Sequence, residues 1–130
     1  GEKSGIPKRD PVPDDLPWQR EMNPDVVQLF RFSAITFNPH RIHYDRTYAT
    51  EVEGYPGLVV HGPFTTQCLL DLVRDMNPGK TMRQFDMRAR APLFDTAPFK
   101  VCGQPTDEGC EVWAATPEGT VAMQAQVKFA

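Results

Sequence analysis

Residues 55–79, YPGLVVHGPFTTQCLLDLVRDMNPG, carry the clearest structural pattern in the chain. Pro63 suits the first position of a helix, and apolar side chains recur at helical spacing after it. These side chains are Phe64, Cys68, Leu69, Leu72, Val73 and Met76. An Asn-Pro-Gly sequence directly after them would end the helix. Because the apolar stripe is broad, the pattern predicts a helix that is deeply buried against a sheet.

The chain after Lys80 changes to the two-residue period that is typical of strands. Four segments have this character: MRQFDMRAR (82–90), PFKVCGQ (98–104), CEVWAAT (110–116) and VAMQAQVKF (121–129). In the last segment we expect Val121, Met123, Ala125, Val127 and Phe129 to share one face. Turn residues between these segments indicate an antiparallel arrangement.

The segments before the helix are less regular. Residues 26–36, VVQLFRFSAIT, are rich in β-branched and aromatic residues, which predicts one more strand. Residues 38–53 are predicted to form a loop with a short helix capped by Asp45. Residues 1–25 contain five prolines and are predicted to form an arm or linker, which Trp18 could anchor to a surface. One α+β domain over residues 26–130, with an antiparallel sheet wrapped around a long central helix, follows from this order.

The composition excludes several classes of function. Lys and Arg total 14 against 17 Asp and Glu, so there is no basic field to attract a nucleic acid. The three cysteines have no C-x-x-C spacing, which favours a reducing compartment. No stretch approaches the ~20 apolar residues of a membrane helix. We therefore expect a cytoplasmic protein, or one of the mitochondrial matrix in a eukaryote, with neither nucleic acid nor membrane as partner.

All three histidines, His40, His43 and His61, lie within 22 positions, in Gly- and Pro-rich turns beside the predicted helix. An imidazole titrates near neutral pH, so His43 can both take and give a proton. The VHGP turn places Gly62 at the helix start, where backbone N–H groups can bind developing negative charge. A base beside such an oxyanion donor is what enolate chemistry needs.

The segments FRFSAITFNPHRIHYDRTYA (30–49) and EGYPGLVVHGP (53–63) resemble the MaoC-like dehydratases. This hot-dog family includes (R)-specific enoyl-CoA hydratases, type 2 3-hydroxyacyl-thioester dehydratases and mesaconyl-CoA hydratase-like proteins. The resemblance covers roughly residues 26–130, including RARAPLFDTAPFKV (88–101). It implies a hot-dog fold and the reversible addition of water to the α,β double bond of an acyl thioester. CoA or an acyl carrier protein would carry the substrate, and no cofactor or metal would be needed.

The resemblance also assigns catalytic residues. The family motif Asp-x-Asn-Pro-Leu-His places its catalytic base at His43, and the Gly62 N–H corresponds to the family's oxyanion donor. Asn38 stands where the family has Asp. An amide can orient water, but it cannot supply a proton at neutral pH. We therefore expect His43, Asn38 and Gly62 to form the catalytic set, with His43 as the main acid/base group.

Other side chains near this set have open roles. The candidate substrate contacts are Val60, Pro63, His40, His61 and Arg41. A structural hydrogen bond to the loop is the simpler role for His61. Arg41 either pairs with a nearby carboxylate or grips a carboxylate or phosphate of the substrate. The three imidazoles could in principle hold zinc, but the family needs no metal and the sequence indicates no second shell for one.

In the resembled family, sites lie between two hot-dog units, which implies a homodimer or pairing with a second hot-dog domain. Residues 1–25 resemble the segment before the catalytic half of two-domain members, so we expect either the C-terminal half of such a protein or a standalone version.

Two alternative functions remain. One is an acyl-CoA thioesterase, which generally needs a carboxylate to activate water. The other is a non-catalytic acyl-binding or partner subunit.

Overall fold

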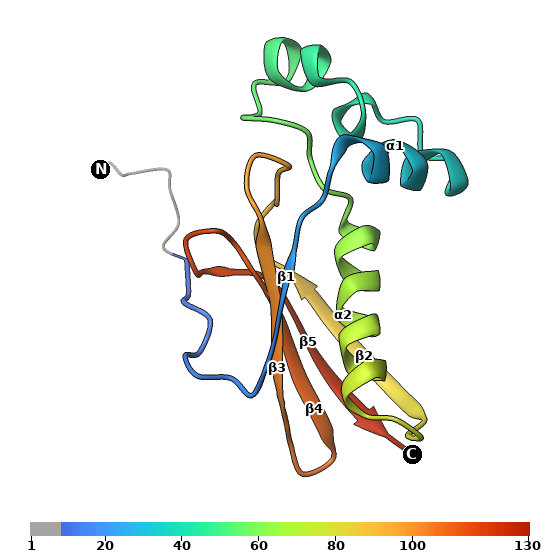
Figure 1. Cartoon of the computed structure of the whole chain (residues 1–130), viewed down its shortest axis with the longest axis vertical. Helices are drawn as coiled ribbons and strands as arrows, with labels where there is room; N and C mark the ends of the chain where they lie inside the picture. Colours follow the sequence, from blue (N-terminus) through green and yellow to red (C-terminus); the bar gives the residue numbers. More distant parts are fainter. Residues whose placement is uncertain (1–8) are drawn as a thin grey trace.

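The computed structural model describes residues 9–130 (Figure 1). In chain order its elements are β1 (Trp18–Met22), α1 (Val26–Ile35), η1 (Arg41–His43), η2 (Tyr48–Val52), α2 (Gly62–Met76), β2 (Met82–Ala89), β3 (Phe99–Pro105), β4 (Gly109–Ala115) and β5 (Val121–Phe129). The central helix α2 therefore begins one residue before the predicted start at Pro63. The four predicted strands after Lys80 are confirmed.

The five strands form one antiparallel sheet in the order β1-β3-β4-β5-β2, and α2 lies along one face of it (Figure 1). Leu69, Leu72 and Val73 of α2 are buried in one core with Val101 and Val112 of the sheet. Burying this stripe removes most of its apolar surface from water, which is the main force that holds the helix on the sheet. The α+β hot-dog prediction is confirmed.

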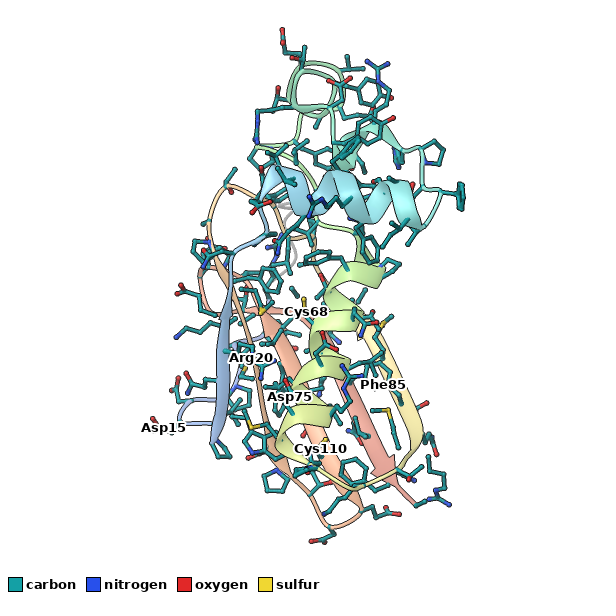
Figure 2. The ribbon with its side chains drawn as sticks, turned by 45° about the vertical axis from the view of Figure 1, so that its right-hand side comes forward. Asp15, Arg20, Cys68, Asp75, Phe85 and Cys110 are labelled. Carbon is teal, nitrogen blue, oxygen red and sulfur yellow. The ribbon has the colours of Figure 1, made fainter. Side chains whose placement is uncertain are left out.

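The three cysteines lie in the interior of the fold. Cys68 of α2 and Cys110 of β4 point into the space between helix and sheet (Figure 2). All three cysteines are free and buried, and burial raises the pKa of the Cys68 thiol to about 11. A thiol of this kind packs in the core and does not act as a nucleophile at neutral pH.

The prediction of a strand at residues 26–36 is wrong, because this segment forms helix α1. Asp25 accepts the Gln28 N–H through its side chain, and Gln28 returns a bond to the Asp25 N–H. This capping box outweighs the β-branched composition at the helix start. Only one narrow stripe of α1, Leu29 and Ser33, is buried, so the segment lacks the broad apolar face that would have marked it as a helix.

The described part of the predicted arm, from residue 9, also differs from expectation. Residues 18–22 form the edge strand β1, whose partner is β3. Trp18 packs against the core, and Leu16 is buried with Trp113 on the opposite face of the sheet. The rest of the arm, residues 1–8, lies outside the described residues.

The predicted face of β5 holds for Met123, Ala125 and Val127, which are buried in the main core. Val121 packs instead with Trp113 on the opposite face. The reason is a shift in the register between β4 and β5 at Ala114 and Ala115, which reverses the alternation at the start of the strand. None of the helices within residues 9–130 has the length and apolar character needed to cross a bilayer.

Beyond the sheet, α1, η1 and η2 form a lobe at the N-terminal end of α2 (Figure 1). Asp45 accepts the Tyr48 N–H at 3.1 Å, so it caps the turn that leads into η2, as predicted. The chain then returns from η2 to the start of α2 at Gly62. The lobe thereby brings the polar residues of 38–45 to the helix N-terminus.

Candidate active site

The predicted histidine cluster forms where the lobe meets α2. His43 lies in η1, and His61 is the N-cap residue of α2. Their rings are stacked, with centroids 3.8 Å apart and planes 18° from parallel, and both side chains are buried. His40 is exposed, and its ring lies edge-on to His43 at 5.7 Å. His43 and His61 are therefore the two central members of the cluster.

One hydrogen bond determines which nitrogen of His43 can act as a base. Nδ1 of His43 lies 2.7 Å from the carbonyl oxygen of Val59. A carbonyl oxygen can only accept, so the proton of the neutral ring is on Nδ1 and the lone pair is on Nε2. Burial lowers the pKa of His43, the bond to Val59 opposes that shift, and the charge of His40 adds to it. The ring is thus kept as the neutral base at pH 7.

His61 is more deeply buried than His43 and has a different partner. Its Nε2 lies 2.7 Å from Oγ of Ser33, while its Nδ1 has no partner among the described residues. Burial, with the nearby His43, lowers the pKa of His61 to about 4. The ring of Phe32 packs beside it at 4.8 Å. His61 does make a structural hydrogen bond, but its partner is on α1 and not in the loop.

Gly62 directly follows His61 and is the first residue of α2. Its N–H belongs to the first turn, where helical N–H groups have no intrahelical acceptor. A Cβ at Gly62 would meet nothing within 4 Å, so the space in front of this residue is open. Pro63, the next residue, is also exposed.

Gly62 borders a groove of about 360 Å³. The other lining residues are Val60, Thr65, Ala89, Arg90, Ala91, Pro92, Leu93, Ala122 and Met123. Of the candidate substrate contacts, Val60 lines this groove and Pro63 does not. The groove gives a ligand access to the helix start from the side of β2 and β5.

Asn38 is held at the end of α1 by two bonds. Its N–H donates to the Ser33 carbonyl oxygen at 2.8 Å, and its Oδ1 accepts the His40 N–H at 3.1 Å. Phe37, just before it, has a left-handed φ of 54° and is 90% exposed. Asn38 lines a second, largely apolar groove of about 440 Å³ with Phe30, Ser33, Ala34, Phe37, Pro39 and Tyr44. His40 thus contributes a backbone contact that orients Asn38.

Arg41 pairs with a nearby carboxylate, which is the first of the two roles considered for it. Its Nε and Nη2 both donate to Oδ2 of Asp45, at 3.1 and 2.8 Å. Its guanidinium also lies 4.4 Å from the centre of the Tyr48 ring. The charge of Arg41 is therefore already paired within the lobe.

Two groups that touch the histidine pair were not predicted. One is Ser33, and its signal was present, since Ser33 falls four residues after Leu29 on the only buried stripe of α1. The other is the Val59 carbonyl oxygen, a backbone atom with no sequence signal. Within residues 9–130, no group of three or more His, Cys, Asp or Glu side chains is arranged to hold a metal ion.

Comparison with known proteins places these features in a family context. The family model of hydroxyacyl-thioester dehydratase type 2 matches residues 2–95. Mesaconyl-C(4)-CoA hydratase of Chloroflexus aurantiacus is 45% identical over 96% of this chain, which spans 46% of that relative. The mitochondrial hydroxyacyl-thioester dehydratase type 2 of Schizosaccharomyces pombe is 40% identical over 61% of this chain and 27% of its own length. The chain therefore spans half or less of these relatives.

Among solved structures, the (R)-hydratase from A. caviae involved in PHA biosynthesis has a similar fold. Its TM-score is 0.74 at 15% identity, and the alignment covers 91% of this chain and 100% of that structure. At this level of identity the likeness concerns the fold alone. It extends over almost the whole chain, lobe and sheet together.

Proposed function

This chain belongs to the hydroxyacyl-thioester dehydratase type 2 family, and we propose that it catalyses the reversible removal of water from a 3-hydroxyacyl thioester. The single observation that carries the proposal is the state of His43. Its Nδ1–H is fixed on the Val59 carbonyl, which leaves Nε2 as a proton acceptor, and its ring is stacked on the residue just before Gly62. This stacking supports the proposal that His43 and the Gly62 N–H act in one site.

In the dehydration direction, Nε2 of His43 takes the proton from the carbon next to the thioester carbonyl. The carbonyl oxygen becomes an enolate oxygen and accepts the Gly62 N–H, and one such donor is typically worth ~3 kcal/mol in the transition state. The hydroxyl group then leaves the next carbon and receives the proton from the His43 imidazolium, which yields water and the α,β double bond. Hydration is the reverse sequence.

Asn38 has a supporting part in this scheme. Its amide holds the leaving hydroxyl or the attacking water, while His43 alone carries the proton. Oδ1 of Asn38 is fixed by the His40 N–H, which supports a defined orientation for the amide. Val60 borders the groove that reaches Gly62, and this groove would take the thioester arm of the substrate.

Hydrolysis of the thioester is a weaker alternative. It generally needs a carboxylate that activates water for attack at the carbonyl carbon. Asp45, the carboxylate next to the histidines in sequence, is already bound by Arg41 and by the Tyr48 N–H. The same Arg41 pairing leaves no unpaired charge there for a carboxylate of the substrate, so we propose a substrate without a second carboxylate.

The site would be completed by a second hot-dog unit, either another copy or a domain of the same polypeptide. The supporting observation is β2, which pairs with β5 on one side only and is exposed along most of its length. An unpaired strand edge is a ready template for another sheet. The exposed apolar residues of α1, among them Val27 and Phe30, would also be covered in such an assembly. CoA or an acyl carrier protein would present the acyl group.

The decisive experiment incubates the purified chain with a panel of 2-enoyl-CoA esters that differ in length, branching and terminal charge. Loss of the enoyl absorbance with formation of the 3-hydroxyacyl ester is the expected result. Release of free thiol would indicate the thioesterase instead. Binding of the esters without either change would indicate a non-catalytic subunit.

A further inference from the structure

We infer that Asp95 is a positioning residue that holds His43 in its Nδ1–H form by tying together the two segments that meet at the His43–Val59 bond. The inference rests on the proposed function in taking His43 as the base. Asp95 lies in the connection between β2 and β3, far from the histidines in sequence. It does not touch either imidazole.

The carboxylate of Asp95 binds two different segments. Its Oδ1 accepts the Leu58 N–H at 2.9 Å and one guanidinium N–H of Arg46 at 3.1 Å. Its Oδ2 accepts a second Arg46 N–H at 2.6 Å. Only 5% of the Asp95 side chain is exposed, against 52% for Arg46. Bidentate, charge-assisted bonds to a nearly buried carboxylate are among the strongest and most directional in proteins.

The two partners of Asp95 lie close in sequence to the two residues that form the His43–Val59 hydrogen bond. Arg46 lies three residues after His43, on the lobe that carries the base. Leu58 directly precedes Val59, whose carbonyl oxygen is the acceptor. Two backbone hydrogen bonds join the same segments. The Asp95 N–H donates to the Leu58 carbonyl at 3.0 Å, and the Val59 N–H donates to the Ile42 carbonyl at 2.9 Å.

Gly57 is an independent observation that supports the inference, because the backbone there passes very close to the Asp95 carboxylate. A Cβ at Gly57 would lie 2.8 Å from Oδ1 of Asp95 and 2.7 Å from Cγ2 of Thr96. Both contacts are too short for carbon, so a larger residue would push the 57–59 segment away from the carboxylate. The absence of a side chain at residue 57 is what lets Leu58 reach Asp95.

The tautomer of His43 depends on the position of the Val59 carbonyl oxygen. If the Val59 carbonyl moves by about 1 Å, Nδ1 loses its acceptor and the neutral ring can carry its proton on either nitrogen. A ring with the proton on Nε2 cannot accept the substrate proton there. Misplacement on this scale can cost about 100-fold in rate. Loss of Asp95 should therefore lower kcat through the tautomer of a residue that it does not contact.

The test compares Asp95→Ala, Asp95→Asn and Arg46→Gln in the full 130-residue chain. Arg20→Gln is the matched control, because the Arg20–Asp75 ion pair also joins distant segments. It does so between β1 and the end of α2 remote from the lobe (Figure 2). The first readout is the nitrogen chemical shifts of the His43 imidazole, which report its tautomer directly. The second is kcat and KM on the best enoyl ester.

We expect wild type and Arg20→Gln to show one tautomer, protonated on Nδ1. Asp95→Ala should show a mixture, with kcat reduced about 10- to 100-fold and KM nearly unchanged. Asp95→Asn keeps an acceptor for the Leu58 N–H and should recover most of the single tautomer. If Asp95→Ala does not fold, Arg46→Gln is the test, because it changes an exposed side chain. We expect this variant to show a partial mixture of the two His43 tautomers.

A folded Asp95→Ala variant, or Arg46→Gln in its place, with the wild-type tautomer would overturn the inference. The nitrogen shifts need no turnover. If no variant and no wild-type protein acts on any enoyl ester, the proposed function fails, while the positioning of His43 by Asp95 is still decided by the spectra.

Discussion

His43 and His61 stack face to face, with ring centroids 3.8 Å apart, although 17 residues separate them in sequence. Two positive charges at this distance repel strongly, so the pair disfavours a second proton. The contact couples the lobe to the first turn of α2. It also gives the candidate base a rigid, uncharged neighbour, whose own position is fixed by Ser33.

The buried His61 should make stability depend on pH. Its pKa is lowered to about 4 in the folded chain, below the ordinary 6.5, so the unfolded chain binds more protons between these values. Stability is then full above pH 6.5 and falls as the pH drops toward 4, by about 2 kcal/mol between pH 7 and pH 5. Urea unfolding across this range measures it. His61→Gln should weaken the dependence, leaving the contribution of His43, whose pKa burial also lowers, whereas the exposed His40→Gln should not change it. An equal slope in all three proteins would refute the assignment.

Removal of the base should abolish most of the turnover. His43→Ala is expected to lower kcat by about 10²- to 10⁴-fold, the usual contribution of a general acid–base group. The variant should still fold, because the lobe retains its other contacts, although loss of the buried ring lowers its stability. Steady-state kinetics on the best enoyl ester checks this, with Arg20→Gln as a variant outside the site. Turnover at the wild-type rate in His43→Ala would rule out the mechanism.

Asn38 can be tested against the acid of the wider family. Asn38→Asp should fold normally, because a carboxylate oxygen can still accept the His40 N–H. We expect it to retain activity within about tenfold, whereas Asn38→Ala, which removes the polar group, should lose about 10- to 100-fold. Parallel kcat measurements distinguish them. Equal losses in both variants would mean that the amide donor itself is required.

Ser33 should matter for stability despite its small size. Ser33→Ala removes the partner of the buried His61 Nε2 and leaves that nitrogen unsatisfied, at a cost of about 1–3 kcal/mol. Thr36→Ala, which removes an exposed hydroxyl at the end of the same helix, should cost much less. Chemical unfolding compares the two. A difference within measurement error would show that the Ser33–His61 bond contributes nothing to stability.

The open edge of β2 should govern assembly. Met87 is 46% exposed on this strand, and Met87→Lys would place a charge where a second sheet would pair. We expect the wild-type chain to run as a dimer and Met87→Lys as a single chain in light scattering coupled to size exclusion. Glu21→Lys, on the opposite edge strand β1, should leave the dimer intact. Dissociation by Glu21→Lys alone would move the interface to β1.

Much of the fold was predictable because its signals are local. The period of α2 and the alternation of the later strands each follow from side chains a few residues apart. The strand predicted at 26–36 was wrong because apolar residues of α1 such as Phe30 are exposed, so only the narrow stripe of Leu29 and Ser33 faces the core. The capping box of Asp25 and Gln28 is the local sequence feature that favours the helix.

Residue types and their spacing within short segments were enough to predict α2, its VHGP start and the four later strands, and the resemblance to the dehydratases indicated His43 as the candidate base. The free nitrogen of His43, the stacking of His61 on its ring and the pairing of Arg41 are evident only in the folded chain. These features depend on backbone carbonyls, ring planes and carboxylates, most of which come together from segments far apart in the sequence. Asp95 is the clearest case, because its two bonding partners lie 49 and 37 residues away.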